Sequence, residues 1–466
     1  MDIIKLLKNT QNKVLLYGDI LIDEHVNIKT NRISSEFPVP VYEKVDEFKI
    51  LGGAGNVLNN LINFNIDTVI LTILNDRYTN FIEQKNIINI KDETYKNIKK
   101  RRYFSNHFHC FRVDDDNNYI MKKEIEDKFI EKIDTIISNF NYILISDYNT
   151  GIVNKKIVYH LIKKANEYKI PTIIDPKNYY EYYKNCFLIK PNKNDAEIIS
   201  NIKINNIRDA EKACDIINKK LNSHSCLITL GEKGCVFKNK DVFFYEPCHN
   251  IVSHNVLDVT GAGDTFISGI CLGLINSLDF KKICNLCNLF CSDIIKRKNV
   301  STVNIITICK KKYNIINTIE ECIILKKYLK NKKIVFTSGC FDLVHEGHIK
   351  CLHECAKLGD ILIVALNTDI SIKNLKGQER PINNLKTRLK ILSSIKYVDF
   401  IVTFSDNTPN KILELIKPDI LVKGGDYSYD KIKKIFPSIK ENQYVSIPLI
   451  ENISTSIIIN KINQEK

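Results

Sequence analysis

The sequence predicts an α/β protein with two domains. A chain of 466 residues is too long for one ordinary hydrophobic core. Short apolar runs alternate with amphipathic stretches, and this alternation is interrupted once, near residue 325. The runs end in Gly, Asp, Asn or Pro, which places polar residues at the carboxyl ends of parallel strands. Open α/β sheets bind their ligands at that edge, so we expect the chemistry there.

Composition indicates a globular protein, since 44% of the residues are hydrophobic and 26% are charged. The formal net charge of +14 is spread along the chain without an aromatic-spaced basic motif. We therefore expect phosphorylated small molecules as partners and no nucleic acid. The N-terminus lacks the apolar core of a signal peptide, and no apolar run is long enough to span a bilayer. These features predict a cytoplasmic protein without a membrane partner.

The fifteen cysteines follow no disulfide framework and are expected to be reduced. Cys284, Cys287 and Cys291 have the spacing of one helix face, and no second CxxC pair accompanies them. Because free cysteine behaves as a small hydrophobe, we interpret the three as core residues and not as metal ligands.

The apolar runs divide the chain into a domain of residues 1–310, a lysine-rich connector of residues 311–328 and a domain of residues 329–466. In the first domain the strand-like runs are VLLYGD, TVILTIL, YILISDY, PTIIDP, CFLIKPN and SCLITLGEKG. In the second they are KIVFTSGCFD, DILIVALN, DFIVTF, DILVKGG and YVSIPL. Helical segments separate the runs in both domains.

The segment Asp258-Val-Thr-Gly-Ala-Gly-Asp264 enters a helix and predicts a phosphate cradle. Gly261 and Gly263 allow the backbone to approach an anion, and the amides at the helix start supply donors and a positive dipole end. A carboxylate beside a phosphate suits a general base, so Asp264 is the candidate for that role. The alternative is that Asp264 caps the helix.

A second glycine motif, Gly52-Gly53-Ala-Gly-Asn56, opens another helix and suits a polyhydroxylated ligand. Together the two motifs resemble the ribokinase-like family of sugar kinases over residues 12–300. The resemblance implies that Asp264 is the base and that Gly261, Ala262 and Gly263 form the anion hole. It also implies sugar contacts from Asp19, Asp23, Gly52, Gly53 and Asn56, substrate phosphate binding by Lys177, and nucleotide or phosphate contacts from Asn192, Glu197 and Gly231.

One stretch of the first domain departs from this family. Between Leu71 and Arg101 the segment that carries part of the family's lid is short, which weakens the expectation of water exclusion. A degenerate kinase domain that only binds sugar or dimerises is therefore a second hypothesis, although the base and the anion hole are intact.

The second domain carries His345-Glu-Gly-His348 between a strand and a helix. Two imidazoles there can donate to one anion beside the helix amides. Zinc is disfavoured, because the spacing is shorter than the helical i, i+4 pair and no third ligand follows. Capping histidines are the remaining alternative.

This motif resembles the HxGH nucleotidyltransferases, a family with a Rossmann-like α/β fold. The resemblance implies that His345 and His348 stabilise the phosphorus centre under attack. Segments around residues 375–388 and 421–427, and Arg32 to Pro40 in the first domain, resemble the bifunctional heptose 7-phosphate kinases and heptose 1-phosphate adenylyltransferases. The implied nucleotide and phosphate contacts are Cys340, Phe341, Lys376, Arg388, Lys423, Ser454, Thr455 and Ser456.

The resemblance implies two reactions in the synthesis of ADP-heptose. The first domain would phosphorylate D-glycero-D-manno-heptose 7-phosphate at its anomeric hydroxyl, and the second would join AMP from ATP to heptose 1-phosphate. ATP and Mg²⁺ are the expected cofactors, with the metal held mainly by nucleotide phosphates and no separate protein site. We also expect a homodimer through the kinase domain. A cytidylyltransferase acting on another sugar or alcohol phosphate is the alternative for the second domain.

Overall fold

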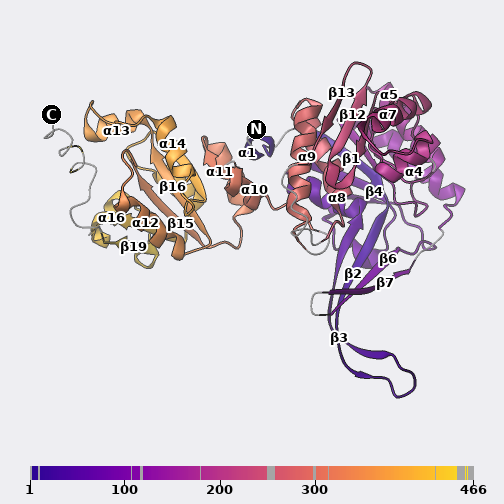
Figure 1. The fold of residues 1–466 in the computed structure, drawn as a ribbon, viewed down its shortest axis with the longest axis horizontal. Coiled ribbons are helices and arrows are strands. Elements are labelled where there is room, and N and C mark those ends of the chain that lie inside the picture. The colour runs from indigo at the N-terminus through magenta and orange to yellow at the C-terminus, as the bar shows by residue number, and fades with distance from the viewer. Residues whose placement is uncertain are drawn as a thin grey trace. The chain divides into compact units, whose positions relative to one another are not determined.

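The computed structural model divides into two compact units. The larger unit comprises residues 9–304, and the smaller unit combines residues 1–8 with residues 305–466. The structure describes residues 3–8, 11–105, 108–115, 119–178, 180–248, 258–297, 301–312, 314–425, 427–448, 457 and 459. Both units are α/β, and the predicted fold class of two successive α/β domains is confirmed (Figure 1).

The described part of the larger unit contains a nine-stranded sheet. In spatial order its strands are β13 (Phe243–Glu246), β12 (Cys235–Asn239), β11 (Ser225–Thr229), β10 (Leu188–Ile189), β9 (Thr172–Asp175), β8 (Tyr142–Ser146), β1 (Lys13–Gly18), β4 (Asp67–Thr72) and β5 (Ile87–Asn89). The pairs from β11 to β5 are parallel, and β12 and β13 are antiparallel. Central strands such as β8 (YILIS) are almost continuously apolar, because helices cover parallel sheets on both faces.

The helices of the larger unit start where the sequence offers caps. The Asn154, Asn192 and Asn206 side chains each accept a backbone amide at a helix start. The helices are α2 (Ala54–Asn63), α3 (Asp76–Thr79), α4 (Lys123–Ile136), α5 (Lys155–Glu167), α6 (Lys193–Ser200), α7 (Ile207–Leu221), α8 (Ala262–Ile275) and α9 (Phe280–Ile294).

Helix α8 is apolar almost all round because it is buried in the core of the larger unit. Gly269 and Gly273 let α9 approach closely: a Cβ on them would lie 2.8 Å from Sγ of Cys287 and 2.5 Å from Cγ1 of Ile283. This packing fixes the N-terminal end of α8, where the candidate base lies.

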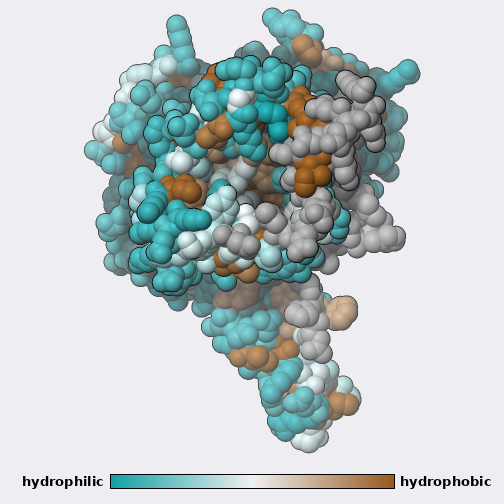
Figure 2. Space-filling view, turned by 90° about the vertical axis from the view of Figure 1, so that its left-hand side faces the viewer, coloured by the Kyte–Doolittle hydropathy of each residue, from teal (hydrophilic) through white to brown (hydrophobic). Residues whose placement is uncertain are grey.

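A four-stranded sheet projects from the larger unit (Figure 1). Its order is β3 (Pro40–Gly53), β2 (Ile20–Ile33), β6 (Lys99–Ser105) and β7 (Phe108–Asp115). We expected the lid segment between Leu71 and Arg101 to be short. The structure instead builds this sheet mainly from the strands on either side of that stretch, two of them 14 residues long. Figure 2 shows apolar patches on the projecting part, among hydrophilic residues.

The described part of the smaller unit contains a six-stranded parallel sheet. Its order is β14 (Ile315–Ile316), β17 (Phe400–Phe404), β16 (Ile361–Asn367), β15 (Ile334–Gly339), β18 (Ile420–Gly424) and β19 (Tyr444–Ile447). The helices are α1 (Ile3–Leu6), α10 (Ile305–Lys312), α11 (Ile319–Tyr328), α12 (Glu346–Lys357), α13 (Asp369–Lys376), α14 (Leu385–Ser393), α15 (Asn410–Ile416) and α16 (Tyr429–Ile435).

Much of the segment that we expected to be a connector, residues 311–328, is folded into the smaller unit. Strand β14 pairs with β17, and α11 packs against α15 and α1. Lys8, just after α1, forms an ion pair with Glu320 at 2.6 Å. The apolar residues of this stretch, such as Ile324 and Leu325, are buried, which explains why it is not an open linker. None of the described helices is long and apolar enough to cross a membrane.

Candidate active sites

Two adjoining cavities lie at the carboxyl edge of the nine-stranded sheet, and Thr229, Gly231, Val259 and Gly263 line both of them. The first, of ≈ 650 Å³, extends between α8 and α9 and is called the α8–α9 cavity. The second, of ≈ 620 Å³, is called the lysine cavity. Its charged lining residues are Lys100, Asp147, Asp175, Lys177, Lys190, Lys193 and Asp195.

Asp264 is 3% exposed and is not among the residues that line either cavity, but it directly follows Gly263, which lines both. Its Oδ2 accepts a hydrogen bond from Nδ2 of Asn56 at 2.8 Å, and its Oδ1 accepts one from the Tyr148 hydroxyl at 2.5 Å. Burial raises the pKa of Asp264 to about 7, and the two hydrogen bonds oppose this rise. Since the helix begins at Gly261 without a side-chain cap, Asp264 is not a capping residue. A carboxyl group of this pKa suits general base catalysis at neutral pH.

The loop before Asp264 has the geometry of an anion cradle. Gly261 has a φ of +81°, a left-handed conformation that favours glycine, and it starts α8. Ala262 lines the α8–α9 cavity, and Gly263 lines both cavities. On the opposite wall Gly231 has a φ of +64°. The positive end of the α8 dipole therefore faces the place where the cavities meet.

The Gly52-Gly53 motif brings strands close to the site. A Cβ on Gly52 would lie 2.1 Å from Oδ2 of Asp23, and one on Gly53 would lie 2.6 Å from the Asp19 carbonyl oxygen. Only glycine fits at such distances. Asn56, three residues later, is the part of this motif that contacts Asp264.

The two carboxylates predicted to contact sugar are engaged within the protein. Asp19 accepts from the Thr150 hydroxyl and from the Tyr148 amide, each at 2.7 Å, and so holds the loop after β8. Asp23 forms an ion pair with Arg102 of β6. Neither residue is among those lining the lysine cavity.

Of three further predicted contacts, the structure brings two to the lysine cavity. Lys177 and Asn192 line it, but Glu197 does not, because its Oε1 accepts from the Ile204 amide at 2.8 Å. Asp195 is the carboxylate that lines the cavity. A residue three positions after Asn192 lies on the cavity side of α6, whereas one five positions after it does not.

Two residues of this site escaped the sequence reasoning. Tyr148 lines the lysine cavity and donates to Asp264. Lys190 lines the same cavity, is 2% exposed, and forms an ion pair with Asp175 at 2.9 Å. A signal was present for the second, since a lysine that ends an apolar strand run, CFLIK, is an unusual residue to bury.

In the smaller unit the two histidines of the HxGH motif lie together at the start of α12. Their ring centroids are 3.9 Å apart, and the His345 amide donates to Nδ1 of His348. Phe341, with a φ of +45°, packs 5.0 Å from the His348 ring. Burial lowers the pKa of His348 to about 4, with smaller effects of His345 and Lys376. Nδ1 of His345 is buried and has no hydrogen-bond partner among the described residues.

Lys423 lies at the carboxyl end of β18 in the same unit. Its Nζ donates to the Ser338 hydroxyl at 2.6 Å, and burial lowers its pKa to about 8. The Sγ atom of Cys340 lies 3.9 Å from Oδ1 of Asn367. Lys376 is exposed at the end of α13.

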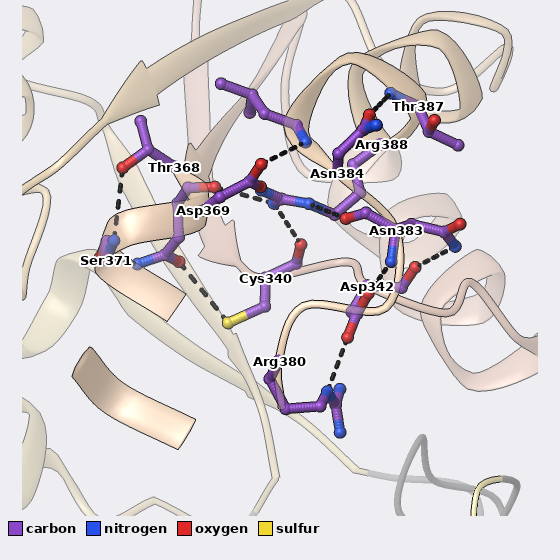
Figure 3. Close-up of polar contacts among 12 residues, drawn as sticks. Cys340, Asp342, Thr368, Asp369, Ser371, Arg380, Asn383, Asn384, Thr387 and Arg388 are labelled. Carbon is purple, nitrogen blue, oxygen red and sulfur yellow. Dashed lines mark hydrogen bonds and ion pairs between the residues drawn. The ribbon is translucent and has the colours of Figure 1, made fainter. Parts of the chain in front are cut away.

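Arg388 was expected to bind phosphate, and the structure gives it a different role (Figure 3). Its side chain is fully buried and donates to protein acceptors only. These are Asp369 Oδ1 at 2.6 Å and the carbonyl oxygens of Cys340, Asn367 and Asn383 at 2.8, 2.8 and 3.0 Å. Arg388 therefore joins the loop after β15 to the end of β16, the start of α13 and the residues before α14, and it has no free face for a phosphate.

A similar bond network surrounds Asp342, which follows Phe341. Its carboxylate accepts from Nε of Arg380 at 2.7 Å and from the amides of Ile382 and Asn383. These hydrogen bonds outweigh burial and lower its pKa. Two arginines outside the sequence motif, Arg380 and Arg388, thus hold the loop that precedes the histidines (Figure 3).

The predicted Ser/Thr phosphate motif and the question of a metal site remain to be compared with the structure. Ser454, Thr455 and Ser456 fall among the residues that the structure does not describe. In the described ranges no group of three or more His, Cys, Asp or Glu side chains has the arrangement of a metal site. Cys284 and Cys287 are buried free thiols in α9.

Comparisons with known proteins agree with this division into two sites. Residues 11–307 match the pfkB family of carbohydrate kinases, and residues 336–461 match the cytidylyltransferase-like family. Escherichia coli phosphofructokinase-2 in complex with potassium has a TM-score of 0.51 to the chain at 13% identity. That match covers 63% of this chain and 95% of the other, and it shows the fold of the kinase part.

Relatives of similar length carry both parts. "Bifunctional protein HldE" of Nitratiruptor sp. is 32% identical over 465 residues, which is 96% of this chain and 98% of the relative. The protein of the same name from Helicobacter pylori is 35% identical over 468 residues, 97% of this chain and 99% of the relative. The chain therefore belongs to the HldE family of bifunctional heptose 7-phosphate kinases and heptose 1-phosphate adenylyltransferases.

Proposed function

We propose that Asp264 is the base of the kinase reaction and that the two cavities of the larger unit hold its two substrates. The observation that carries this proposal is a buried carboxylate with a pKa of about 7, next to Gly263 of both cavities and hydrogen-bonded to Tyr148 of the lysine cavity. ATP occupies the α8–α9 cavity, and the heptose 7-phosphate occupies the lysine cavity. Asp264 takes the proton of the anomeric hydroxyl while the amides of residues 261–263 face the phosphates.

Mg²⁺ belongs to this proposal as the partner of the nucleotide phosphates. Asp195 lines the lysine cavity and carries carboxylate oxygens, and oxygen ligands suit this ion. The residues present therefore fit a magnesium ion that is held mainly by phosphate and reached by Asp195. When bound, it would neutralise charge on the phosphoryl groups.

In the smaller unit, His345 and His348 face the α-phosphate of a second ATP. Both rings are neutral at neutral pH because burial lowers their pKa values, so each offers one N–H donor. Lys423, Lys376 and the N-terminus of α12 supply positive charge around the same place. This set stabilises the charge that gathers on phosphorus when the heptose 1-phosphate attacks and pyrophosphate leaves.

The experiment is phosphorus NMR of the purified chain with magnesium-ATP and heptose 7-phosphate, followed by ATP or CTP with heptose 1-phosphate. We expect an anomeric phosphate in the first reaction, and ADP-heptose with pyrophosphate in the second with ATP alone. A chain that leaves heptose 7-phosphate unchanged has a degenerate kinase unit. A chain that turns over CTP in preference to ATP is a cytidylyltransferase.

Homodimerisation through the kinase unit and a cytoplasmic location complete the proposal. The projecting sheet exposes large apolar side chains that a second copy could cover. Among them are Ile33, Phe37, Val45 and Phe108, which are 70%, 69%, 58% and 77% exposed. Light scattering after gel filtration measures the mass, and a monomer at micromolar concentration would contradict the dimer. We place the protein in the cytoplasm because it uses ATP, and fractionation of cells tests this location.

A further inference from the structure

Lys190 is a buried cation at the edge of the nine-stranded sheet. It directly follows β10, is 2% exposed, and its Nζ lies 2.9 Å from Oδ1 of Asp175 at the end of β9. Removing a lysine from water costs several kcal/mol, and replacing such pairs by apolar residues is often neutral or stabilising. A buried pair that lines a cavity therefore calls for a reason other than stability.

The position of Lys190 relates it to the reacting groups. Its Nζ lies 4.0 Å from the point that a Cβ on Gly263 would occupy, beside the first turn of α8. Its charge also lowers the pKa of Asp264, against the effect of burial. Gly263 lines both cavities, so the ammonium group lies next to the point where they join.

We propose that Lys190 is a catalytic residue that binds the phosphoryl group while it passes from ATP to the sugar. In this step the bond between the γ-phosphorus and the β,γ-bridging oxygen breaks, and its electron pair leaves with ADP. The anomeric oxygen forms the new bond to phosphorus, and its proton goes to Asp264. Lys190 neutralises the equatorial oxygens during the transfer, and among the described lining residues of the lysine cavity it is the buried cation.

Other lysines of the cavity do not fit this role. Lys177 and Lys193 are exposed, and Lys193 lies 3.8 Å from Glu197. Lys100 is half-buried and belongs to the projecting sheet. Exposed or mobile cations suit the phosphate that the sugar already carries, whereas a fixed, buried cation suits a charge that develops only in the transition state.

The test is Lys190→Met, with Lys238→Met as the matched control. Lys238 also forms a 2.9 Å ion pair, with Glu211, on β12 of the same sheet, but it lines neither cavity. We expect kcat of the kinase to fall by about 10²-fold or more in Lys190→Met, with the KM for heptose 7-phosphate changed by less than about threefold. The control should keep the kinase rate, and adenylyl transfer by each preparation reports its active concentration.

A double variant separates catalysis from folding. Lys190→Met alone leaves Asp175 buried without its partner, whereas Lys190→Met with Asp175→Asn leaves no uncompensated charge. If Lys190 only holds the fold, the double variant regains activity. If it acts on the phosphoryl group, the double variant stays slow. The acidic limb of the pH profile of kcat/KM should also move to higher pH in Lys190→Met, because Asp264 loses a neighbouring positive charge.

The inference rests on the kinase function proposed above, and the two fail in different ways. A wild-type chain that does not phosphorylate heptose 7-phosphate would contradict the proposed function. A wild-type chain that does so beside an equally active Lys190→Met variant would overturn the role of Lys190 alone. Recovery of the wild-type rate in the double variant would also overturn it.

Discussion

The hydroxyl of Tyr148 donates a hydrogen bond of 2.5 Å to Asp264, across 116 residues of sequence. This bond stabilises the ionised carboxylate and therefore lowers its pKa, which burial raises. Tyr148 thus favours the ionised form of the proposed base.

Tyr148→Phe should move the acidic limb of the kinase pH profile. Removing the hydrogen bond raises the pKa of Asp264 above about 7, and the base works only when ionised. The rate should therefore drop several-fold at pH 6 and approach that of the wild type at high pH. The measurement is kcat/KM for heptose 7-phosphate from pH 5.5 to 9, with the exposed Tyr159→Phe as control. An unmoved limb would show that Tyr148 does not tune the base.

Asp264→Asn should abolish sugar phosphorylation while ATP binding and adenylyl transfer persist. The amide keeps the shape but cannot take the proton, and loss of a general base costs about 10² to 10⁴ in rate. Kinase turnover and ATP affinity are measured on one preparation. Near-normal turnover would refute the assignment of the base.

His348→Ala should remove adenylyl transfer and spare the kinase. A single donor to the charge developing on phosphorus is worth about 10² to 10³ in rate. The measurement is pyrophosphate release from ATP and heptose 1-phosphate, and His353→Ala at a half-exposed position of α12 is the control. If only the KM for ATP rose, His348 would be a binding group instead.

The pH profile of adenylyl transfer should fall on its alkaline side through the pKa of Lys423, about 8 in the free protein. The cationic form is the one that attracts nucleotide phosphates, and it is lost as pH rises. Lys423→Arg should move this limb to higher pH, because arginine stays charged. The quantity to measure is kcat/KM for ATP. Identical limbs in both proteins would exclude Lys423 as the titrating group.

Arg388→Met should destabilise the smaller unit by about 3 kcal/mol, because it leaves Asp369 and three carbonyl groups, of which that of Asn367 is buried, without their donor. Adenylyl transfer is lost with the fold of the unit, and the kinase rate is kept. Thermal unfolding followed beside both assays tests this, and the exposed Lys386→Met on the same helix is the control. A stable Arg388→Met variant that merely binds ATP weakly would restore the phosphate-binding role.

The sequence predicts the groups that lie close together along the chain and misses those that meet only in space. Asp264 and the glycines before it form one continuous motif, which is enough to predict their cradle. Tyr148 and Lys190 come from other strand ends, so nothing local marks them as neighbours of Asp264. Which of two nearby carboxylates faces a cavity depends on the rotation of the helix that carries them. The sequence motif indicates Glu197 as the cavity residue, but Asp195 is the one that lines the cavity.

Burial is equally hard to predict for a charged side chain. An arginine near a nucleotide motif suggests phosphate binding, because guanidinium groups bind phosphate well. The carbonyl oxygens that occupy Arg388 belong to three separate segments, one of them the end of β16, and only the folded chain brings them to one point. Strand β14, within the predicted connector, is two residues long and too short for a periodicity to show.

The contact of α1 with α11 also bears on the order of events during synthesis. The residues of α1 are made before those of α11, and this partner helix follows about 300 residues later, roughly 15 to 60 s afterwards at typical elongation rates. Ile3, Ile4 and Leu6 have no native packing site during that interval, while the larger unit can complete its sheet. The residues of α1 are therefore made early and reach their final place late.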